Sequence, residues 1–114
     1  MPMKIAIPTA GGRLCSHFGH CEQFAMVEVD EARRQILQTS YSTPPAHEPG
    51  VLPKWLYDQG VHVVISGGMG RRASEFFRIL GIRVVVGAPA ETPEQVAAAF
   101  LSGSLVAGEN PCDH

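Results

Sequence analysis

Cysteine and histidine gather in one short segment near the start of the sequence. Cys15, His17, His20 and Cys21 lie together in the stretch LCSHFGHCE. Thiolate sulfur and imidazole nitrogen are ligands that suit zinc, copper(I), iron and iron–sulfur units. The spacing Cys-x-His-x-x-His-Cys matches none of the common zinc-finger patterns. The segment therefore predicts part of a metal site whose other ligands come from elsewhere in the chain; a loop with one buried cysteine and exposed histidines is the alternative.

Further candidate ligands lie far along the sequence. Cys112-Asp113-His114 forms a second cluster, and His47 follows three prolines in a predicted loop. His47 is the weaker candidate, because a loop histidine is often only solvated. Three cysteines is an odd number, and the N-terminal MPMKIAIP has no signal-peptide hydrophobic region, so we expect a cytoplasmic chain with ligating thiolates rather than disulfides.

A glycine-rich turn provides a second kind of candidate site. Gly67, Gly68 and Gly70 precede Arg71 and Arg72 in SGGMGRR, which lacks the lysine and spacing of a Walker A loop. The two arginines stand at the amino end of a predicted helix, where the helix dipole disfavours cations. A bound anion, such as a thiolate-rich cluster, would compensate. We expect these residues to face the cluster; two solvated arginines are the alternative.

Hydrophobic periodicity divides the chain into five expected strands and three expected helices. Apolar residues from Ala73 to Leu80 recur at helical spacing, and Thr92-Pro93-Glu94-Gln95 is a capping box with proline at its first helical position. The expected strands cover residues 3–8, 24–30, 35–41, 61–66 and 82–86. One expected helix follows each of the last three strands, in the order β-β-β-α-β-α-β-α, and the three helices are followed by Gly60, Gly81 and Gly103.

This order predicts an α/β fold with a single mixed five-stranded sheet and helices on both faces. The expected strand order is 3-2-1-4-5, with strand 2 antiparallel. The loops after strands 1, 3, 4 and 5 then open at one edge, where ligand crevices of such sheets lie. His62 begins strand 4 at the opposite edge, so we expect it to be structural. The tail also starts there, and roughly ten extended residues, about 33 Å, would bring Cys112 and His114 back.

Composition limits the classes of function. The chain has 114 residues, of which 45% are hydrophobic and 18% charged, so we expect one domain over residues 1–114. The net charge of -2 and the lack of a basic run argue against nucleic-acid binding. No apolar run is long enough to span a membrane.

Other chemistries have less support from the residues. A metal-dependent nuclease needs gathered carboxylates, and the first strand carries none. No Ser/His/Asp triad is evident. A thiol redox enzyme would need a cysteine of depressed pKa. A structural zinc site in a regulatory or protein-interaction module is the alternative to a cluster-binding protein.

Several segments carry a family resemblance across essentially the whole chain. MKIAIPT, HFGHCEQF, PPAHEPGVLPKWL, GVHVVISGGMGRRA, GIRVVVGAPAETPEQVAAAFLSGSL and GENPCDH resemble the dinitrogenase iron–molybdenum cofactor biosynthesis family. This is the NifX-like group, which also forms the C-terminal part of NifB proteins.

The resemblance implies a ribonuclease-H-like fold and a non-catalytic role. Such a protein would bind, carry or deliver an iron–molybdenum or iron–sulfur cluster, or its precursor, between donor and acceptor proteins. His17, in the HFG motif, is the residue that the resemblance most directly implies as a ligand. Cys15, Cys21 and Cys112 make this chain richer in sulfur than many members.

Overall fold

The computed structural model describes residues 3–15, 21–45 and 51–105 of the chain. In these ranges three helices lie among six strands. They are β1 (Met3–Ala10), β2 (Arg13–Leu14), β3 (Gln23–Asp30), β4 (Gln35–Ser42), α1 (Val51–Asp58), β5 (Val63–Ile65), α2 (Arg71–Leu80), β6 (Arg83–Val85) and α3 (Pro93–Ser102).

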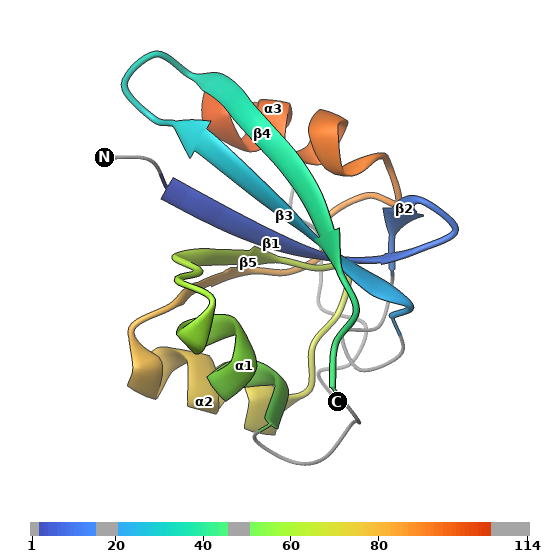
Figure 1. Cartoon of the computed structure of the whole chain (residues 1–114), viewed down its shortest axis with the longest axis vertical. Coiled ribbons are helices and arrows are strands. Elements are labelled where there is room, and N and C mark those ends of the chain that lie inside the picture. Colours follow the sequence, from blue (N-terminus) through green and yellow to red (C-terminus); the bar gives the residue numbers. More distant parts are fainter. Residues whose placement is uncertain (1–2, 16–20, 46–50, 106–114) are drawn as a thin grey trace.

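All six strands belong to one mixed sheet (Figure 1). The order along it is β4-β3-β1-β5-β6, and the short β2 pairs with β1 off this path. β3 runs antiparallel to β1 and to β4, whereas β5 runs parallel to β1 and to β6. Because β1, β5 and β6 point the same way, the loops that follow them meet at one edge of the sheet.

The predicted count of five strands was wrong, because the chain folds back immediately after β1. Gly11 and Gly12 have φ values of 63° and 80°, the left-handed conformation that a two-residue hairpin turn of type I′ requires at both positions. The turn pairs Thr9 with Leu14 and Ala10 with Arg13. Leu14 is buried there and packs in the core, which stabilises this short sixth strand.

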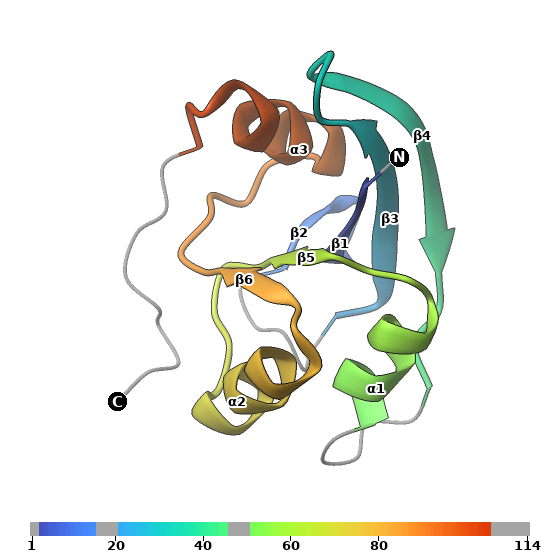
Figure 2. The same cartoon turned by 90° about the vertical axis from the view of Figure 1, so that its left-hand side faces the viewer.

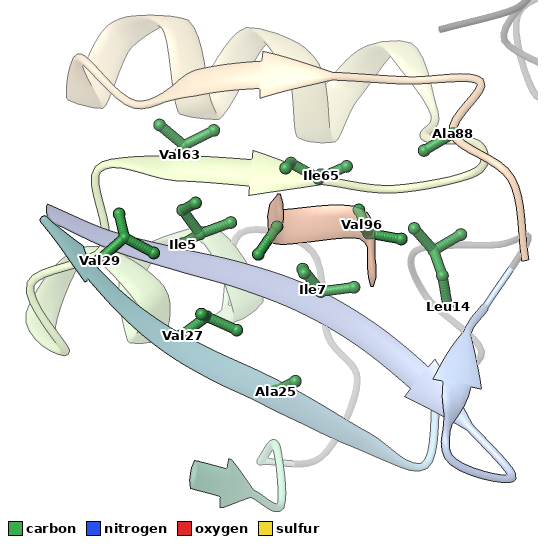
Figure 3. Close-up of a cluster of buried hydrophobic side chains, with 11 residues drawn as sticks. Ile5, Ile7, Leu14, Ala25, Val27, Val29, Val63, Ile65, Ala88 and Val96 are labelled. Carbon is green, nitrogen blue, oxygen red and sulfur yellow. The ribbon is translucent and has the colours of Figure 1, made fainter. Parts of the chain in front are cut away.

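Two apolar clusters lie on opposite faces of the sheet. On one face α3 contributes Val96 and Ala97 to a cluster that includes Ile5 and Ile7 of β1. Figure 3 shows Val96 of this cluster together with the two isoleucines. On the other face α1 and α2 cover the sheet, as Figure 2 shows. Successive side chains of a strand point to opposite faces, and β1 therefore contributes to both clusters.

The helix ends follow the predicted capping residues. The Thr92 side chain accepts a hydrogen bond from the Gln95 amide, and the Gln95 side chain accepts one from the Thr92 amide, which completes the capping box. Gly81 and Gly103 end α2 and α3 in the left-handed conformation, with φ values of 78° and 77°. These caps fix where α3 begins, and hence the path of the loop that precedes it.

Candidate functional site

Both ends of the Cys/His segment are attached to the end of β1. The Cys15 amide donates a hydrogen bond of 2.8 Å to the carbonyl oxygen of Pro8. The Glu22 amide donates one of 2.8 Å to the carbonyl oxygen of Thr9. The chain between these anchors includes residues 16–20, so the candidate ligands His17 and His20 lie outside the described ranges. The anchors nevertheless fix where the segment leaves and rejoins the sheet.

Pro8 determines where the pairing of β1 with β2 stops. This residue is buried in the central strand and accepts the bond from Cys15. Proline has no N–H, so it returns no bond of its own, and a strand ladder cannot continue past it on that side. β2 accordingly ends at Leu14. Cys15 is the first residue beyond the sheet.

The two described thiols lie close enough to influence each other. Cys15 and Cys21 are both half-buried, and Cys21 packs against the apolar cluster under α1 and α2. The pKa of the Cys21 thiol is raised to about 11, mainly by burial and also by the neighbouring charge of Cys15, while a backbone hydrogen bond acts to lower it. A metal cation beside this pair would reverse both effects and favour thiolate.

The glycine-rich loop after β5 is held by the loop after β6. Gly87 donates its amide to the Gly67 carbonyl at 2.9 Å, and Ala88 donates to Ser66 at 3.2 Å. The buried Ser66 hydroxyl donates to the Gly68 carbonyl at 2.9 Å. Carbonyl groups of this loop therefore accept hydrogen bonds from other groups of the same chain, and these bonds fix the shape of the loop. Met69 is fully buried in the cluster under α1 and α2.

A third set of bonds joins the first loop to the last. The Leu14 amide donates to the Glu91 carbonyl at 2.9 Å, and the Arg13 guanidinium donates to the Ala90 carbonyl at 3.4 Å. The loops after β1, β5 and β6 thus form one connected edge, which we call the ligand edge: residues 13–15, 21–22, 66–72 and 87–91.

The amino end of α2 lies at this ligand edge. Its N-cap is Gly70, whose extended backbone has φ -66° and ψ 155° and which offers no side-chain cap. A Cβ added at Gly70 would meet nothing within 4 Å. Arg71 and Arg72 are exposed in the first turn, which contains no acidic residue. Positive charge from the helix dipole and from two guanidinium groups therefore coincides here.

Sequence reasoning missed two polar residues that shape the ligand edge. The Glu22 carboxylate accepts a hydrogen bond of 2.8 Å from the Gly11 amide, which ties the β1–β2 turn to the returning chain. Ser66 holds the glycine-rich loop, as described above. A serine at the end of a continuous apolar strand was the available signal for Ser66. Glu22 carried no such signal, because its partner depends on the hairpin that was not predicted.

The remaining candidates are divided between the far edge and the undescribed parts of the chain. His62 lies at the opposite edge, where its Nδ1 accepts a bond from the Lys4 amide at 3.1 Å, in keeping with a structural role. His47, Cys112 and His114 lie outside the described residues. Within residues 3–15, 21–45 and 51–105, no three His, Cys, Asp or Glu side chains converge in a metal-binding group. No helix in those ranges has the length and apolarity to cross a bilayer.

The model of the dinitrogenase iron–molybdenum cofactor family matches residues 1–103. The chain belongs to this family. The match includes the Cys/His segment and the glycine-rich loop, and it ends before Cys112.

Individual proteins and solved structures are similar to this chain over most of its length. An uncharacterized protein of Methanocaldococcus jannaschii is 32% identical over 106 residues, which are 90% of this chain and 89% of that protein. The crystal structure of PH0822 is 32% identical with a TM-score of 0.84, and the match covers 92% of this chain and 94% of that one. The apo form of the orange protein from Desulfovibrio gigas has the same fold, with 23% identity, a TM-score of 0.76 and 97% of each chain covered.

Proposed function

We propose that this protein binds and carries an iron–molybdenum or iron–sulfur type cluster, or its precursor, without catalysing a reaction itself. The observation that supports this most is the pair of thiols at the end of β1, which lie near enough for the charge of Cys15 to raise the pKa of Cys21. Soft sulfur donors at a ligand edge suit these metals. Family membership points the same way.

The proposed ligands come from several segments of the chain. Cys15, His17, Cys21 and Cys112 are the principal ones, with His20, His47 and His114 as secondary donors. Gly67, Gly68, Gly70, Arg71 and Arg72 would form the wall that faces an anionic cluster. The start of α2 supports this wall, because its N-cap Gly70 supplies no side-chain cap and the dipole of a helix start attracts negative charge. Proteins that donate and accept the cluster are the expected partners.

Two further points belong to the same proposal. The order β4-β3-β1-β5-β6, with β3 antiparallel to its neighbours, supports a ribonuclease-H-like arrangement of the five longer strands. The cytoplasmic location expected from the N-terminal sequence stays a prediction.

Elemental analysis and absorbance test the proposal together. Protein reconstituted anaerobically with ferrous iron, sulfide and molybdate should show a broad visible charge-transfer band and should retain metal through gel filtration. His17→Ala should weaken metal binding by at least about tenfold, as expected when a ligand is lost. His62→Ala, at the far edge, is the matched histidine control and should bind as the parent does.

A different result would favour the zinc alternative. Colourless protein that retains one zinc ion per chain after the same treatment would contradict the cluster proposal. Equal loss of metal in His17→Ala and His62→Ala would contradict the assignment of His17.

A further inference from the structure

The two edge strands of the sheet are built differently. β6, at one edge, has three residues and begins with the charged Arg83. β4, at the other edge, has eight residues, Gln35–Ser42, and none of them is charged or proline. Soluble proteins protect an edge strand against pairing with another chain by shortness, charge, proline or a bulge. β6 has two of these protections, whereas β4 has only a bulge, at one position.

This bulge limits the part of β4 that can accept a further strand. It lies at Leu37, between the residues that pair with Glu28 and Val29 of β3. A bulge leaves one residue outside the ladder and bends its strand. Beyond Leu37 the pairing with β3 is continuous over Gln38–Ser42. These five residues, which we call the edge segment, form a regular strand on which pairing can extend.

The outer side of the edge segment has no partner in the part of the chain that the structure describes. No strand there pairs with β4 on that side, and Figure 2 shows β4 at the margin of the molecule. Apart from the ladder with β3, no backbone hydrogen bond among the described residues involves the segment. Backbone groups of a strand point alternately to its two sides, so every second residue directs its N–H and C=O outward. Leu37 and Tyr41, on the same strand, are 55% and 45% exposed.

The side chains of the edge segment suit pairing with an identical strand. In an antiparallel pair centred on Ser40, this serine lies opposite its own copy, Thr39 lies opposite Tyr41, and Gln38 lies opposite Ser42. Aromatic with β-branched side chains, and hydroxyl with hydroxyl, are favourable cross-strand pairs. Because the segment contains no charged residue, no like charges are brought together. The strand is therefore complementary to itself in charge and in side-chain type.

The residues at the two ends of β4 favour the antiparallel arrangement. Arg34 directly precedes β4, and the neutral Thr43 directly follows it. Antiparallel pairing places Arg34 of each copy near the neutral end of the other, whereas parallel pairing would bring the two arginines to the same level. The antiparallel pair also has two-fold symmetry, so the contact is closed and uses the edge of each copy once.

We propose that β4 pairs with β4 of a second copy of this chain, through Gln38–Ser42 in an antiparallel register centred on Ser40. The strands β4-β3-β1-β5-β6 of both copies then form one continuous sheet. The contact is short, so the product is a reversible dimer rather than a permanent one. It uses no residue of the ligand edge and is independent of the proposed metal binding.

Sedimentation of metal-free, full-length protein measures the association. Between about 10 µM and about 1 mM, the weight-average mass should rise from that of one chain toward that of two, as expected for a weak contact. Amide signals of Thr39, Ser40 and Tyr41 should shift over the same range. A mass that stays at one chain throughout would overturn the proposal.

A lysine at the centre of the contact tests its position. Ser40→Lys brings two ammonium groups opposite each other in the dimer and should raise the dissociation constant about fivefold or more. Ser102→Lys changes an exposed serine at the end of α3 that lies away from β4 (Figure 2), and it should leave the dissociation constant unchanged. Far-ultraviolet circular dichroism verifies that both variants fold. If both weaken the dimer equally, net charge governs association and β4 is wrongly assigned.

Cysteine cross-linking tests the register. In a chain whose native cysteines are replaced by alanine, Ser40→Cys lies opposite its own copy, at the short separation that a disulfide requires. Gln38→Cys is the matched control, because it is also exposed but lies opposite Ser42 of the second copy. Oxidation should therefore link Ser40→Cys chains much faster than Gln38→Cys chains. Equal rates, or the reverse order, would refute the register.

A strand of another protein is the competing occupant. An extended, neutral peptide of alternating threonine and valine serves as the probe. If this peptide shifts the amide signals of Gln38–Ser42 while the chain alone stays monomeric, the edge accepts a foreign strand and the second-copy proposal is wrong.

Discussion

Cys21 combines a side chain of a type that can bind metal with an apolar setting. Its thiol is half-buried against the cluster that includes Phe24 and Met69, and burial is the main reason that its pKa rises to about 11. A thiol of this kind is protonated and slow to react at neutral pH, which is the opposite of a redox-active cysteine. Its chemistry fits a group that becomes thiolate when a metal replaces the proton.

Alkylation should show this directly. In metal-free protein, we expect iodoacetamide to modify Cys21 slowly at pH 8, with a rate that rises about tenfold per pH unit and levels off near pH 11, because thiolate is the reacting form. Mass spectrometry of the peptide that contains Cys21 measures the rate. A plateau near the ordinary thiol pKa of 9.0 would show that burial does not govern this group.

The same shift has a consequence for stability. The folded-state pKa lies above the unfolded value, so the folded protein binds more protons between pH 9 and pH 11. The contribution of Cys21 is therefore fully present below pH 9 and is lost as the pH rises toward 11. Denaturant titrations of metal-free protein across this window should show a falling free energy of unfolding, and Cys21→Ala should flatten that dependence.

The positive charge at the amino end of α2 is the feature of a single element that would act most directly on an anionic ligand. Gly70 supplies no capping side chain, and the first turn carries Arg71 and Arg72 instead of an acid. Helices usually begin with a residue that accepts hydrogen bonds from the first amides. This helix start departs from that rule, and its dipole favours a negative group there.

Gly70→Asp should separate stability from ligand binding. The new carboxylate would cap α2 and stabilise metal-free protein by roughly 0.3 kcal/mol. It would also compete with an anionic cluster and weaken its binding by about two- to fivefold. Thermal unfolding and cluster titration measure the two effects.

Gly70→Ala is the matched control for this change. The site has open space for a methyl group and an ordinary φ of -66°, so the variant should fold and bind as the parent does. If Gly70→Ala weakens binding as much as Gly70→Asp, the effect is steric and the anion-facing wall is wrongly assigned.

Local sequence signals predicted the elements better than their connections. The capping box at Thr92 and the glycines at 81 and 103 were confirmed, because each acts through atoms only a few residues away. The pair Gly11-Gly12 carried a hairpin signal, yet β2 was missed because Arg13 and Leu14 are too few to show alternation. The bonds that join the ligand edge, such as Gly87 to Gly67, depend on tertiary structure and leave no local pattern.

The whole molecule is organised around β1, whose side chains enter both apolar clusters. Ile5 and Ile7 pack under α3, while Ala6 packs under α1 and α2. A strand shared in this way couples the two faces, since neither cluster can lose β1 without exposing the other. We therefore expect the two faces to unfold together.

A core substitution on one face, read out on the other, tests this coupling. Val96→Ala removes two buried methyl groups under α3 and should lower the free energy of unfolding by about 2 kcal/mol. Trp55, which lies 5.7 Å from Phe24 between ring centres on the opposite face, is the sole tryptophan and reports the result by fluorescence. The midpoint of denaturant unfolding followed by Trp55 fluorescence should shift as far as the midpoint followed by far-ultraviolet circular dichroism. An unchanged Trp55 midpoint would mean that the faces unfold independently.

The bonds between the first and last loops also set an order of events during synthesis. Arg13 and Ala90, which hydrogen-bond at the ligand edge, are 77 positions apart in the chain. A ribosome that has just released the Cys/His segment has yet to make the residues that will hold it in place, and contacts of such long separation form late. Cys15 and Cys21 therefore reach their final arrangement only after Glu91 has left the exit tunnel. A cluster delivered to the nascent chain would meet thiols without their supporting loops, so we expect the proposed cluster to be loaded after translation.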